Sequence, residues 1–303
     1  MSQRVLITGA NGRLGKLLAK HLVSQGHAVR GLVRSNPKGE AQSTAANPSE
    51  LGELLRHTDT LLHLASTSSK DPATQQAVHV ELTQQLLEAA NAAGVANIVY
   101  FSSVKAVAGE HCDQAIGIDR VPEPNSDYGR FKLAAERVLF SYHFSGDTKV
   151  EIVRLPMVYG PSCGGNFDRL AGLVKRGLPI PLARDNARSL LFAGNLCGYV
   201  DALLGGPTLA FDRPRLSHLA DPQPLSSLAL TAMIARAQGG RNASLGLPQW
   251  LARATFRAPL VGGYAARLFG SLELDTTSLN GWTAPFTTEQ GVATALERPQ
   301  AGG

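Results

Sequence analysis

The sequence predicts an α/β fold: a doubly wound parallel sheet followed by a smaller C-terminal α/β lobe. Three observations predict it. Apolar runs of strand length alternate with helical patterns through the first half of the chain, a glycine-rich turn joins the first strand to the first helix, and the alternation stops near residue 160. With 303 residues, 44% of them hydrophobic, the chain can bury one large core and a second, smaller one.

The glycine-rich turn occupies residues 8–15, with the sequence TGANGRLG. An apolar run at 4–7 precedes it, and apolar residues recur at helical spacing over 13–23. Gly9 permits a tight turn, Gly12 lets the backbone approach a pyrophosphate, and Gly15 lets helix and strand pack closely. An ordinary strand–helix turn is the alternative, but this setting favours dinucleotide binding at the helix N-terminus. The predicted cofactor-binding residues of this turn are Gly9, Asn11, Gly12, Arg13, Leu14 and Gly15.

The end of the second predicted strand, residues 26–34, bears on the choice of cofactor. Sites selective for NAD place a carboxylate there to bind the ribose 2′-hydroxyl. This chain has Val33 and then Arg34, with Arg13 in the nearby glycine turn. Two guanidinium groups without a carboxylate suit a 2′-phosphate, so NADP is slightly favoured over NAD. The alternative is that both arginines are solvated surface residues.

The remaining elements of the cofactor domain follow in order. A polar loop over 37–48 separates the second strand from a short helix at 49–56. Further strands are predicted at 59–65, 97–101 and 149–155, and helices at 71–93, ended by Gly94, and from Ser126 or Asp127 to 144. The carboxyl end of the strand at 59–65 lies on the predicted cofactor side, and the strand at 97–101 delivers Ser102 and Ser103 to the same edge.

Beyond residue 160, Pro and Gly become frequent and the regular alternation ends. Helices are predicted at 167–176, 195–204 and 226–238, and short strands at 188–192 and 215–219. Trp250, Phe256 and Phe269 supply apolar bulk near the end of the chain. We therefore expect a cofactor domain over 1–160, a mainly substrate-binding lobe over 161–296 from which some segments return to the sheet, and a disordered tail at 297–303.

Composition narrows the classes of function. The net charge of +5 is scattered without a dense Lys/Arg block, which indicates a solvated surface rather than a nucleic-acid interface. Cys112, Cys163 and Cys197 show neither zinc spacing nor a disulfide framework, so we expect a reducing compartment and no metal site. The N-terminus enters its first strand at once, and no apolar stretch is long enough for a membrane span. These features predict a cytoplasmic protein.

Tyr128 and Lys132 lie four residues apart in a predicted helix, so their side chains share one face. A nearby ammonium favours the phenolate and is expected to lower the tyrosine pKa. Tyr128 would then exchange a proton with a substrate hydroxyl or ketone while a hydride moves to or from a nicotinamide. A serine hydroxyl at the preceding strand end would orient the substrate oxygen. Ser103 is the first choice and Ser102 the second.

Taken together, these motifs resemble the extended short-chain dehydrogenase/reductases. The resemblance is carried by TGxxGxxG at 8–15, DxxxHLA at 59–65, FSSVK at 101–105, YxxxK at 128–132 and RLPxVYGP at 154–161. The second half resembles the nucleotide-sugar branch, which includes 4-epimerase-like proteins and 4-ketoreductases of bacterial polysaccharide pathways. Its motifs are NF at 166–167, GLP at 177–179, RSLLFxxNL at 188–196 and GWTxPF at 281–286.

The resemblance implies roles for individual residues. Ser103, Tyr128 and Lys132 would form a catalytic triad. Asn166 and Arg188 would contact the diphosphate of the substrate, although a plain helix cap and a surface ion pair are the alternatives. Members of the family are often dimers that pair through two helices, here 71–93 and 126–144. The wider sets implied are Leu64, Ala65, Tyr128, Lys132 and Pro156 for the cofactor, and Ser102, Ser103, Asn166 and Arg188 for the substrate.

Three positions depart from the family pattern. His79 stands where the family usually has an asparagine that supports the active-site lysine, Met157 replaces a frequent asparagine, and Val107 stands in a segment that lacks the tyrosine of many epimerases. The leading interpretation is an NAD(P)-dependent enzyme acting at C4 of a nucleotide-linked hexose, as a 4-ketoreductase or a 4-epimerase. The alternatives are a dehydrogenase of a non-nucleotide, steroid-like hydroxy or keto compound, and a non-catalytic NAD(P)-binding protein.

Overall fold

The computed structural model describes residues 2–33, 42–45, 48–161, 163–205, 214–248, 266, 269–279 and 281–297. The chain divides into two compact units. The first unit contains Met1–Val107, Val121–Arg154 and Tyr199–Ser217, and the second contains Ala108–Arg120, Leu155–Gly198 and His218–Gly303. Four features expected from the sequence lie outside the described residues: Arg34, Trp250, Phe256 and the tail beyond Glu297.

The first unit is built on a seven-stranded sheet with the order β10-β6-β5-β4-β1-β2-β3. Its strands are β1 (Arg4–Thr8), β2 (Ala28–Val33), β3 (Gln42–Ala45), β4 (Thr60–His63), β5 (Asn97–Ser103), β6 (Lys149–Leu155) and β10 (Arg215–His218). The pairings of β1 with β2 and β4, of β2 with β3, and of β4 with β5 are parallel. The order reverses at β1, as in doubly wound folds, and the predicted fold class is confirmed.

One strand of this sheet differs from the sequence-based expectation, and another comes from the second half of the chain. The expected polar loop at 37–48 contains β3, because the backbone of Gln42–Ala45 pairs with β2 and extends the sheet edge. The strand expected at 215–219 after the alternation ends is β10, which lies beside β6 in the large sheet. β3 has only four residues, mostly polar, and lacks the apolar alternation of a strand, so its pairing with β2 and not a local pattern defines it.

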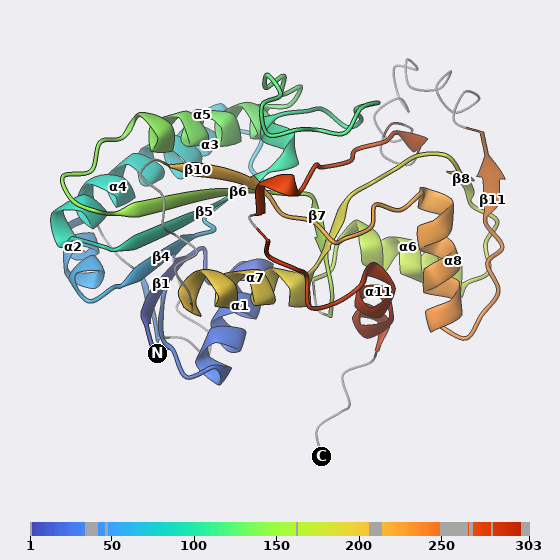
Figure 1. Ribbon diagram of the computed structural model, residues 1–303, viewed down its shortest axis with the longest axis horizontal. Helices are drawn as coiled ribbons and strands as arrows, with labels where there is room; N and C mark the ends of the chain where they lie inside the picture. Colours follow the sequence, from blue (N-terminus) through green and yellow to red (C-terminus); the bar gives the residue numbers. More distant parts are fainter. Residues whose placement is uncertain are drawn as a thin grey trace. The chain divides into compact units, whose positions relative to one another are not determined.

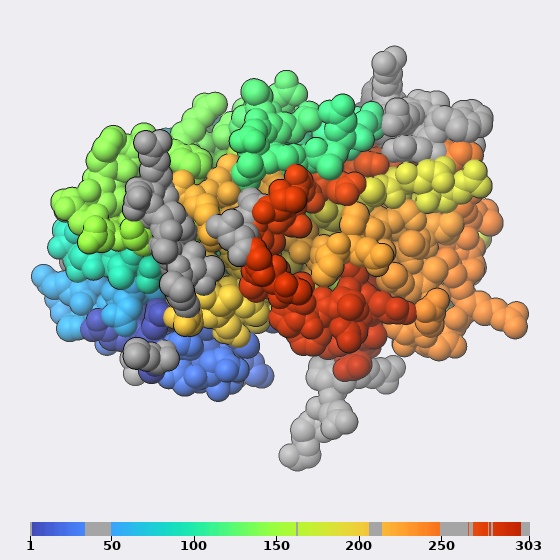
Figure 2. All heavy atoms as spheres, viewed as in Figure 1, coloured from blue at the N-terminus to red at the C-terminus, as the bar shows by residue number. Residues whose placement is uncertain are grey.

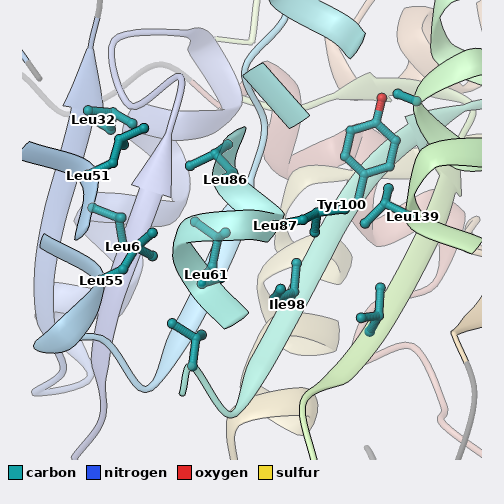
Figure 3. Packing of buried hydrophobic residues seen from close by; sticks show 14 of the residues in the cluster. Leu6, Leu32, Leu51, Leu55, Leu61, Leu86, Leu87, Ile98, Tyr100 and Leu139 are labelled. Atoms are coloured by element: carbon teal, nitrogen blue, oxygen red, sulfur yellow. The ribbon is translucent and has the colours of Figure 1, made fainter. Parts of the chain in front are cut away.

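Helices cover both faces of the sheet (Figure 1), with α1 (Arg13–Ser24) and α7 (Ala193–Gly205) on one side. The other side carries α2 (Pro48–Arg56), α3 (Pro72–Gln76), α4 (Leu82–Ala93) and α5 (Asp127–Ser141). Figure 3 shows the core under α2, α4 and α5, where leucines from these helices meet Leu6, Leu61 and Ile98 of the sheet. This packing fixes α5 against β5 and so determines where the side chains of α5 point.

The helix expected over 71–93 is interrupted. A π-helical turn (Ala77–Glu81) separates α3 from α4, and Gly94 ends α4 in the left-handed conformation with φ 67°, as predicted. The hydroxyl of Thr83 donates a hydrogen bond to the carbonyl oxygen of His79 at 2.6 Å, one turn back. Such a side-chain bond competes with the backbone ladder and accompanies local distortion of helices.

The described residues of the second unit include two short parallel pairs of strands and the helices α6 (Asn166–Lys175), α8 (Ser227–Ala237) and α11 (Thr288–Leu296). β7 (Met157–Tyr159) pairs with β9 (Leu190–Phe192), and β8 (Pro181–Ala183) pairs with β11 (Leu245–Leu247). The helices surround a core that includes Tyr159, Phe167 and Phe192. Figure 2 shows α8 and α11 packed side by side at the surface. No helix among the described residues is long and apolar enough to cross a bilayer.

Candidate active site

The glycine turn closes tightly on itself after β1. A Cβ atom on Gly15 would lie 2.3 Å from the carbonyl oxygen of Gly9, so only glycine lets α1 begin so close to the strand end. Gly9 has φ +70°, and a Cβ there would lie 3.0 Å from the Cα of Ala65, which follows β4. The loops after β1 and β4 therefore touch at the point where the strand order reverses, which is where open α/β sheets bind dinucleotides.

The start of α1 suits an anionic group. Gly12 is the N-cap residue and provides no side-chain cap, so the first N–H groups of the helix are not satisfied by a capping side chain. Arg13, the first helical residue, is exposed. The residues of this turn therefore fit a dinucleotide phosphate, as the glycine spacing predicts. Among the other predicted contacts, Leu64 and Ala65 lie at the end of β4 beside Gly9.

One face of α5 carries the polar groups of the candidate site. Ser126 caps the helix by accepting a hydrogen bond from the backbone N–H of Gly129. Tyr128, Lys132 and Glu136 follow at intervals of four residues, so they share that face. A Cβ on Gly129 would lie 2.2 Å from the carbonyl oxygen of Lys105, so this glycine lets α5 lie directly against the segment after β5.

Tyr128 is held at the ends of two strands. Its hydroxyl shares hydrogen bonds with the side chains of Ser66, which follows β4, and Ser103, the last residue of β5. Burial raises the pKa of Tyr128 above its ordinary value of 10, and the two serine bonds offset only part of that rise. The expected lowering of this pKa by Lys132 is therefore not met: burial has the largest effect on the phenol, and the groups that lower its pKa are the two serines.

Lys132 is buried, and its amino group is directed to the backbone. Its Nζ donates to the carbonyl oxygen of Phe101 at 2.8 Å and lies 4.6 Å from the centroid of the Tyr100 ring. Burial lowers the pKa of Lys132 to about 7, although the Glu136 carboxylate favours the ammonium. An amine with this pKa is partly protonated at neutral pH, so a small change of charge nearby alters its state.

Ser102 points to a different group than Ser103 does. Its hydroxyl donates a hydrogen bond to Glu136, whose carboxylate also accepts from Arg154 Nη2 at 2.7 Å and from Arg154 Nε at 3.0 Å. All three side chains are buried. Ser102 is therefore committed to a buried ion pair, whereas Ser103 contacts Tyr128, and the geometry favours Ser103 as the substrate-orienting serine.

His79 lies in the π-helical turn, next to Tyr128. The two rings meet edge to face, with centroids 5.7 Å apart and an interplanar angle of 78°. Neither ring nitrogen of His79 has a hydrogen-bond partner among the described residues, although the side chain is buried. Burial, with a smaller contribution from the charge of Lys132, lowers the pKa of His79 to about 4. The imidazole is therefore neutral at neutral pH.

The predicted substrate residues Asn166 and Arg188 lie in the second unit. Asn166 is the first residue of α6 and is exposed, and the N-cap is Gly165, so the plain helix cap considered for Asn166 is not what the structure has. Arg188 Nη1 donates to the carbonyl oxygen of Gly270 at 2.7 Å and has longer contacts with the carbonyl oxygens of Glu110 and Ala266. Pro156, a predicted cofactor contact, is buried. Met157, which replaces a frequent asparagine of the family, is exposed.

The sequence interpretation missed several groups of the first unit. Ser66, Gly129, Glu136 and the carbonyl of Phe101 all contact or position the Tyr128–Lys132 pair. Glu136 had a detectable signal, since it lies eight residues after Tyr128 on the same helical face. Ser66 had none, because its contact depends on where the loop after β4 lies relative to α5.

This arrangement can exchange a proton with a bound hydroxyl or carbonyl. A phenol, a serine hydroxyl and a titratable amine lie together at the carboxyl ends of β4 and β5. The glycine turn lies at the same edge of the sheet and in the same unit. A hydroxyl donor beside an amine that titrates near neutral pH is suited to general acid–base chemistry.

Comparisons with known proteins agree with this assignment. The sequence model of the NAD dependent epimerase/dehydratase family matches residues 5–206. The chain is 28% identical over 313 residues to the UDP-glucose 4-epimerase of Vibrio cholerae, covering 96% of this chain and 94% of that protein. It is 30% identical over 194 residues to the UDP-2-acetamido-2,6-beta-L-arabino-hexul-4-ose reductase of Pseudomonas aeruginosa, covering 62% of this chain and 45% of the relative.

Solved structures share the fold. The UDP-glucuronic acid 4-epimerase of Bacillus cereus, solved in complex with NAD, superposes with a TM-score of 0.74 at 19% sequence identity. The alignment covers 96% of each chain. At this identity the likeness establishes the fold over nearly the whole length.

Proposed function

Because the chain belongs to the NAD-dependent epimerase/dehydratase family, we propose that it is an NAD(P)-dependent enzyme that acts at C4 of a nucleotide-linked hexose, as a 4-ketoreductase or a 4-epimerase. One observation carries the proposal: the Tyr128 hydroxyl shares hydrogen bonds with Ser103 and Ser66 at the sheet edge that bears the glycine turn. The relatives named above act at C4 of UDP-linked sugars as epimerase and as reductase, which supports this choice of substrate class.

The proposed mechanism assigns a task to each residue. Ser103 binds the C4 oxygen of the sugar and orients it toward the Tyr128 hydroxyl. Tyr128 donates its proton to a ketone oxygen, or accepts one from a C4 hydroxyl, as general acid or base. The bound dinucleotide supplies the hydride acceptor or donor for C4. Lys132, four residues after Tyr128 on the same helical face, is assigned to stabilise the phenolate when it is an ammonium.

The family to which the chain belongs depends on NAD. A preference of this protein for NADP is a further part of the proposal. β2 ends at Val33 and so offers no carboxylate for a ribose 2′-hydroxyl, and Arg13 is exposed at the start of α1. A relative of known structure binds NAD, so both dinucleotides need to be tested. Isothermal titration of the cofactor-free protein with NADPH and NADH measures the preference, which we expect to be toward NADPH and to shrink in Arg13→Ala.

In the second unit, we assign Asn166 and Arg188 to the diphosphate of the nucleotide sugar. Asn166 lies exposed at the N-terminus of α6, and the Arg188 guanidinium is oriented by its bond to the Gly270 carbonyl. We also propose a cytoplasmic homodimer that pairs through α4 and α5. Light scattering tests the dimer, for which a particle of about 64 kDa is expected, twice the chain mass of 32.0 kDa.

The experiment that tests the function combines two assays on purified protein. UDP-linked and dTDP-linked 4-keto sugars are mixed with NADPH or NADH and followed by loss of absorbance, and UDP-hexoses are followed by NMR for the C4 epimer. Turnover should fall by at least a hundredfold in Tyr128→Phe while dinucleotide binding is kept. Tyr142→Phe, at the end of the same helix, is the matched control. Absence of both activities with every substrate contradicts the proposal.

A further inference from the structure

A chain of buried hydrogen bonds runs beneath the candidate site, through His63. The backbone N–H of Ala65 donates to Thr8 Oγ1 at 3.1 Å, and Thr8 Oγ1 lies 2.7 Å from His63 Nδ1. On the other side of the ring, His63 Nε2 lies 3.0 Å from Thr83 Oγ1, which donates to the carbonyl oxygen of His79 at 2.6 Å. The side chains that form this series of hydrogen bonds, Thr8, His63 and Thr83, are each at most 2% exposed.

The direction of every bond in this chain follows from the donors and acceptors present. The carbonyl of His79 only accepts, so the single proton of the Thr83 hydroxyl is committed to it. His63 Nε2 must then be the donor toward Thr83. Burial, with a smaller effect of the Lys132 charge, lowers the pKa of His63 to about 3, so the ring carries only one proton at neutral pH. Its Nδ1 is therefore the acceptor, and Thr8 donates to it.

Both ends of this chain lie next to groups that touch Tyr128. Ala65 precedes Ser66, whose side chain hydrogen bonds to the Tyr128 hydroxyl. At the other end, His79 presents its ring edge to face with the ring of Tyr128. One hydrogen-bonded chain thus ties the loop after β4 to the π-helical turn (Ala77–Glu81), and the phenol lies between these two segments.

We propose that His63, as the Nε2–H tautomer, is a positioning residue that holds the two segments flanking Tyr128 at a fixed spacing through Thr8 and Thr83. His63 has no bond to Tyr128 among the described residues, so it acts through Ser66 and His79. The kinetic part of this inference rests on the proposed function, because it places the effect on the proton transfer assigned to Tyr128. A shift of about 1 Å in a reacting group reduces turnover by up to about a hundredfold.

The tautomer is tested directly on the wild-type protein. Nitrogen-15 NMR of the labelled protein at pH 7 distinguishes protonated from unprotonated ring nitrogens, and His63→Asn identifies the His63 signals among the eight histidines. A protonated Nε2 with an unprotonated Nδ1 is expected. The opposite tautomer, or a doubly protonated ring, overturns the proposal. This measurement needs neither cofactor nor substrate.

The positioning role is tested with Thr83. Thr83→Val removes the hydroxyl and keeps the shape, whereas Thr83→Ser keeps the hydroxyl. We expect Thr83→Val to shift the ring signals of Tyr128 and to lower kcat about ten- to a hundredfold with little change in KM, and Thr83→Ser to restore both. The control is Thr231→Val in α8, a buried threonine that loses a partly buried bond from its hydroxyl to the Leu228 carbonyl at 2.9 Å.

Two outcomes would overturn the positioning role. One is a Thr83→Val protein whose Tyr128 signals and kcat match those of Thr231→Val. The other is a Thr83→Ser protein as impaired as Thr83→Val, since the hydroxyl would then be irrelevant. If Thr83→Val does not fold, Thr83→Ala against Thr83→Ser provides the same comparison. If the wild-type protein shows no turnover, the proposed function fails, while the tautomer and the Tyr128 signals still decide this inference.

Discussion

Lys132 Nζ donates a hydrogen bond of 2.8 Å to the carbonyl oxygen of Phe101, and this bond directs the amine toward the end of β5. The amine lies among buried groups, and the Glu136 carboxylate favours its charged form. Burial therefore dominates and lowers its pKa to about 7. The sequence suggests an ammonium at this position, whereas burial in the folded protein brings the pKa of Lys132 close to neutral.

The first prediction concerns the alkaline stability of the cofactor-free protein. The folded-state pKa of Lys132 lies below the unfolded value of 10.5, so the unfolded chain binds more protons between about pH 7 and pH 10.5. The free energy of unfolding should rise with pH in this window, by up to about 1.4 kcal/mol per unit from this group. Urea denaturation at several pH values measures it. Lys132→Met should lack this rise, and an identical profile in both proteins would refute the assignment.

The second prediction concerns acid stability. The folded-state pKa of His79 is about 4, below its unfolded value of 6.5, so stability from the neutral ring is present above pH 6.5 and is lost as pH falls toward 4. The slope from this group is up to about 1.4 kcal/mol per pH unit. His79→Asn should remove this part of the slope, while His63 remains in both proteins. The check is chemical denaturation between pH 4 and pH 7, with exposed His57→Asn as the control.

The third prediction separates the two serines at the end of β5. Ser103→Ala removes the hydroxyl that contacts Tyr128 and should lower kcat about a hundredfold, with a loss of about 1 kcal/mol in the free energy of unfolding because Ser103 Oγ also accepts from the Lys105 N–H. Ser102→Ala removes a buried donor to Glu136 and should lower the free energy of unfolding by about 1–3 kcal/mol, with a smaller effect on kcat. Steady-state kinetics and urea denaturation of both variants check this. The opposite pattern would assign the substrate-orienting role to Ser102.

The fourth prediction concerns the close approach of α5 to the segment after β5. A Cβ added at Gly129 would lie 2.2 Å from the Lys105 carbonyl oxygen, so Gly129→Ala should displace the start of α5. Turnover should fall at least tenfold because Tyr128 is the neighbouring residue. Gly172→Ala in α6 is the control, since a Cβ there meets nothing within 4 Å and alanine favours the helix by about 1 kcal/mol. Equal activity of the two variants would contradict the packing argument.

The fifth prediction concerns the buried ion pair of Glu136 and Arg154. Glu136→Gln leaves a buried guanidinium without its counter-charge, so the free energy of unfolding should fall by about 3–5 kcal/mol. Glu53→Gln breaks an exposed pair with Arg56 and should change it by less than about 1 kcal/mol. Thermal and urea denaturation of the two variants provide the comparison, and similar small losses would show that the buried pair contributes no more than a surface pair.

Much of the first unit could be predicted from the sequence because its signals are local. Apolar periodicity placed β1, α1, β5, α5 and β6 within a few residues, and the glycine spacing placed the tight turn between β1 and α1. The four-residue spacing of Tyr128 and Lys132 put both side chains on one face of α5. The strand β3 was missed, since its four residues carry no apolar alternation and it is defined by its pairing with β2.

By itself, the sequence determined the fold class, the turn that suits a dinucleotide and the placement of Tyr128 and Lys132 on one helical face. Each depends on residues that are neighbours along the chain. Only the tertiary structure decided what those side chains meet. Burial raises the pKa of Tyr128 and lowers that of Lys132, Ser102 turns to Glu136, and His63 joins two segments that flank the phenol. Desolvation and hydrogen-bond direction depend on atoms brought together from distant segments, and no local pattern encodes them.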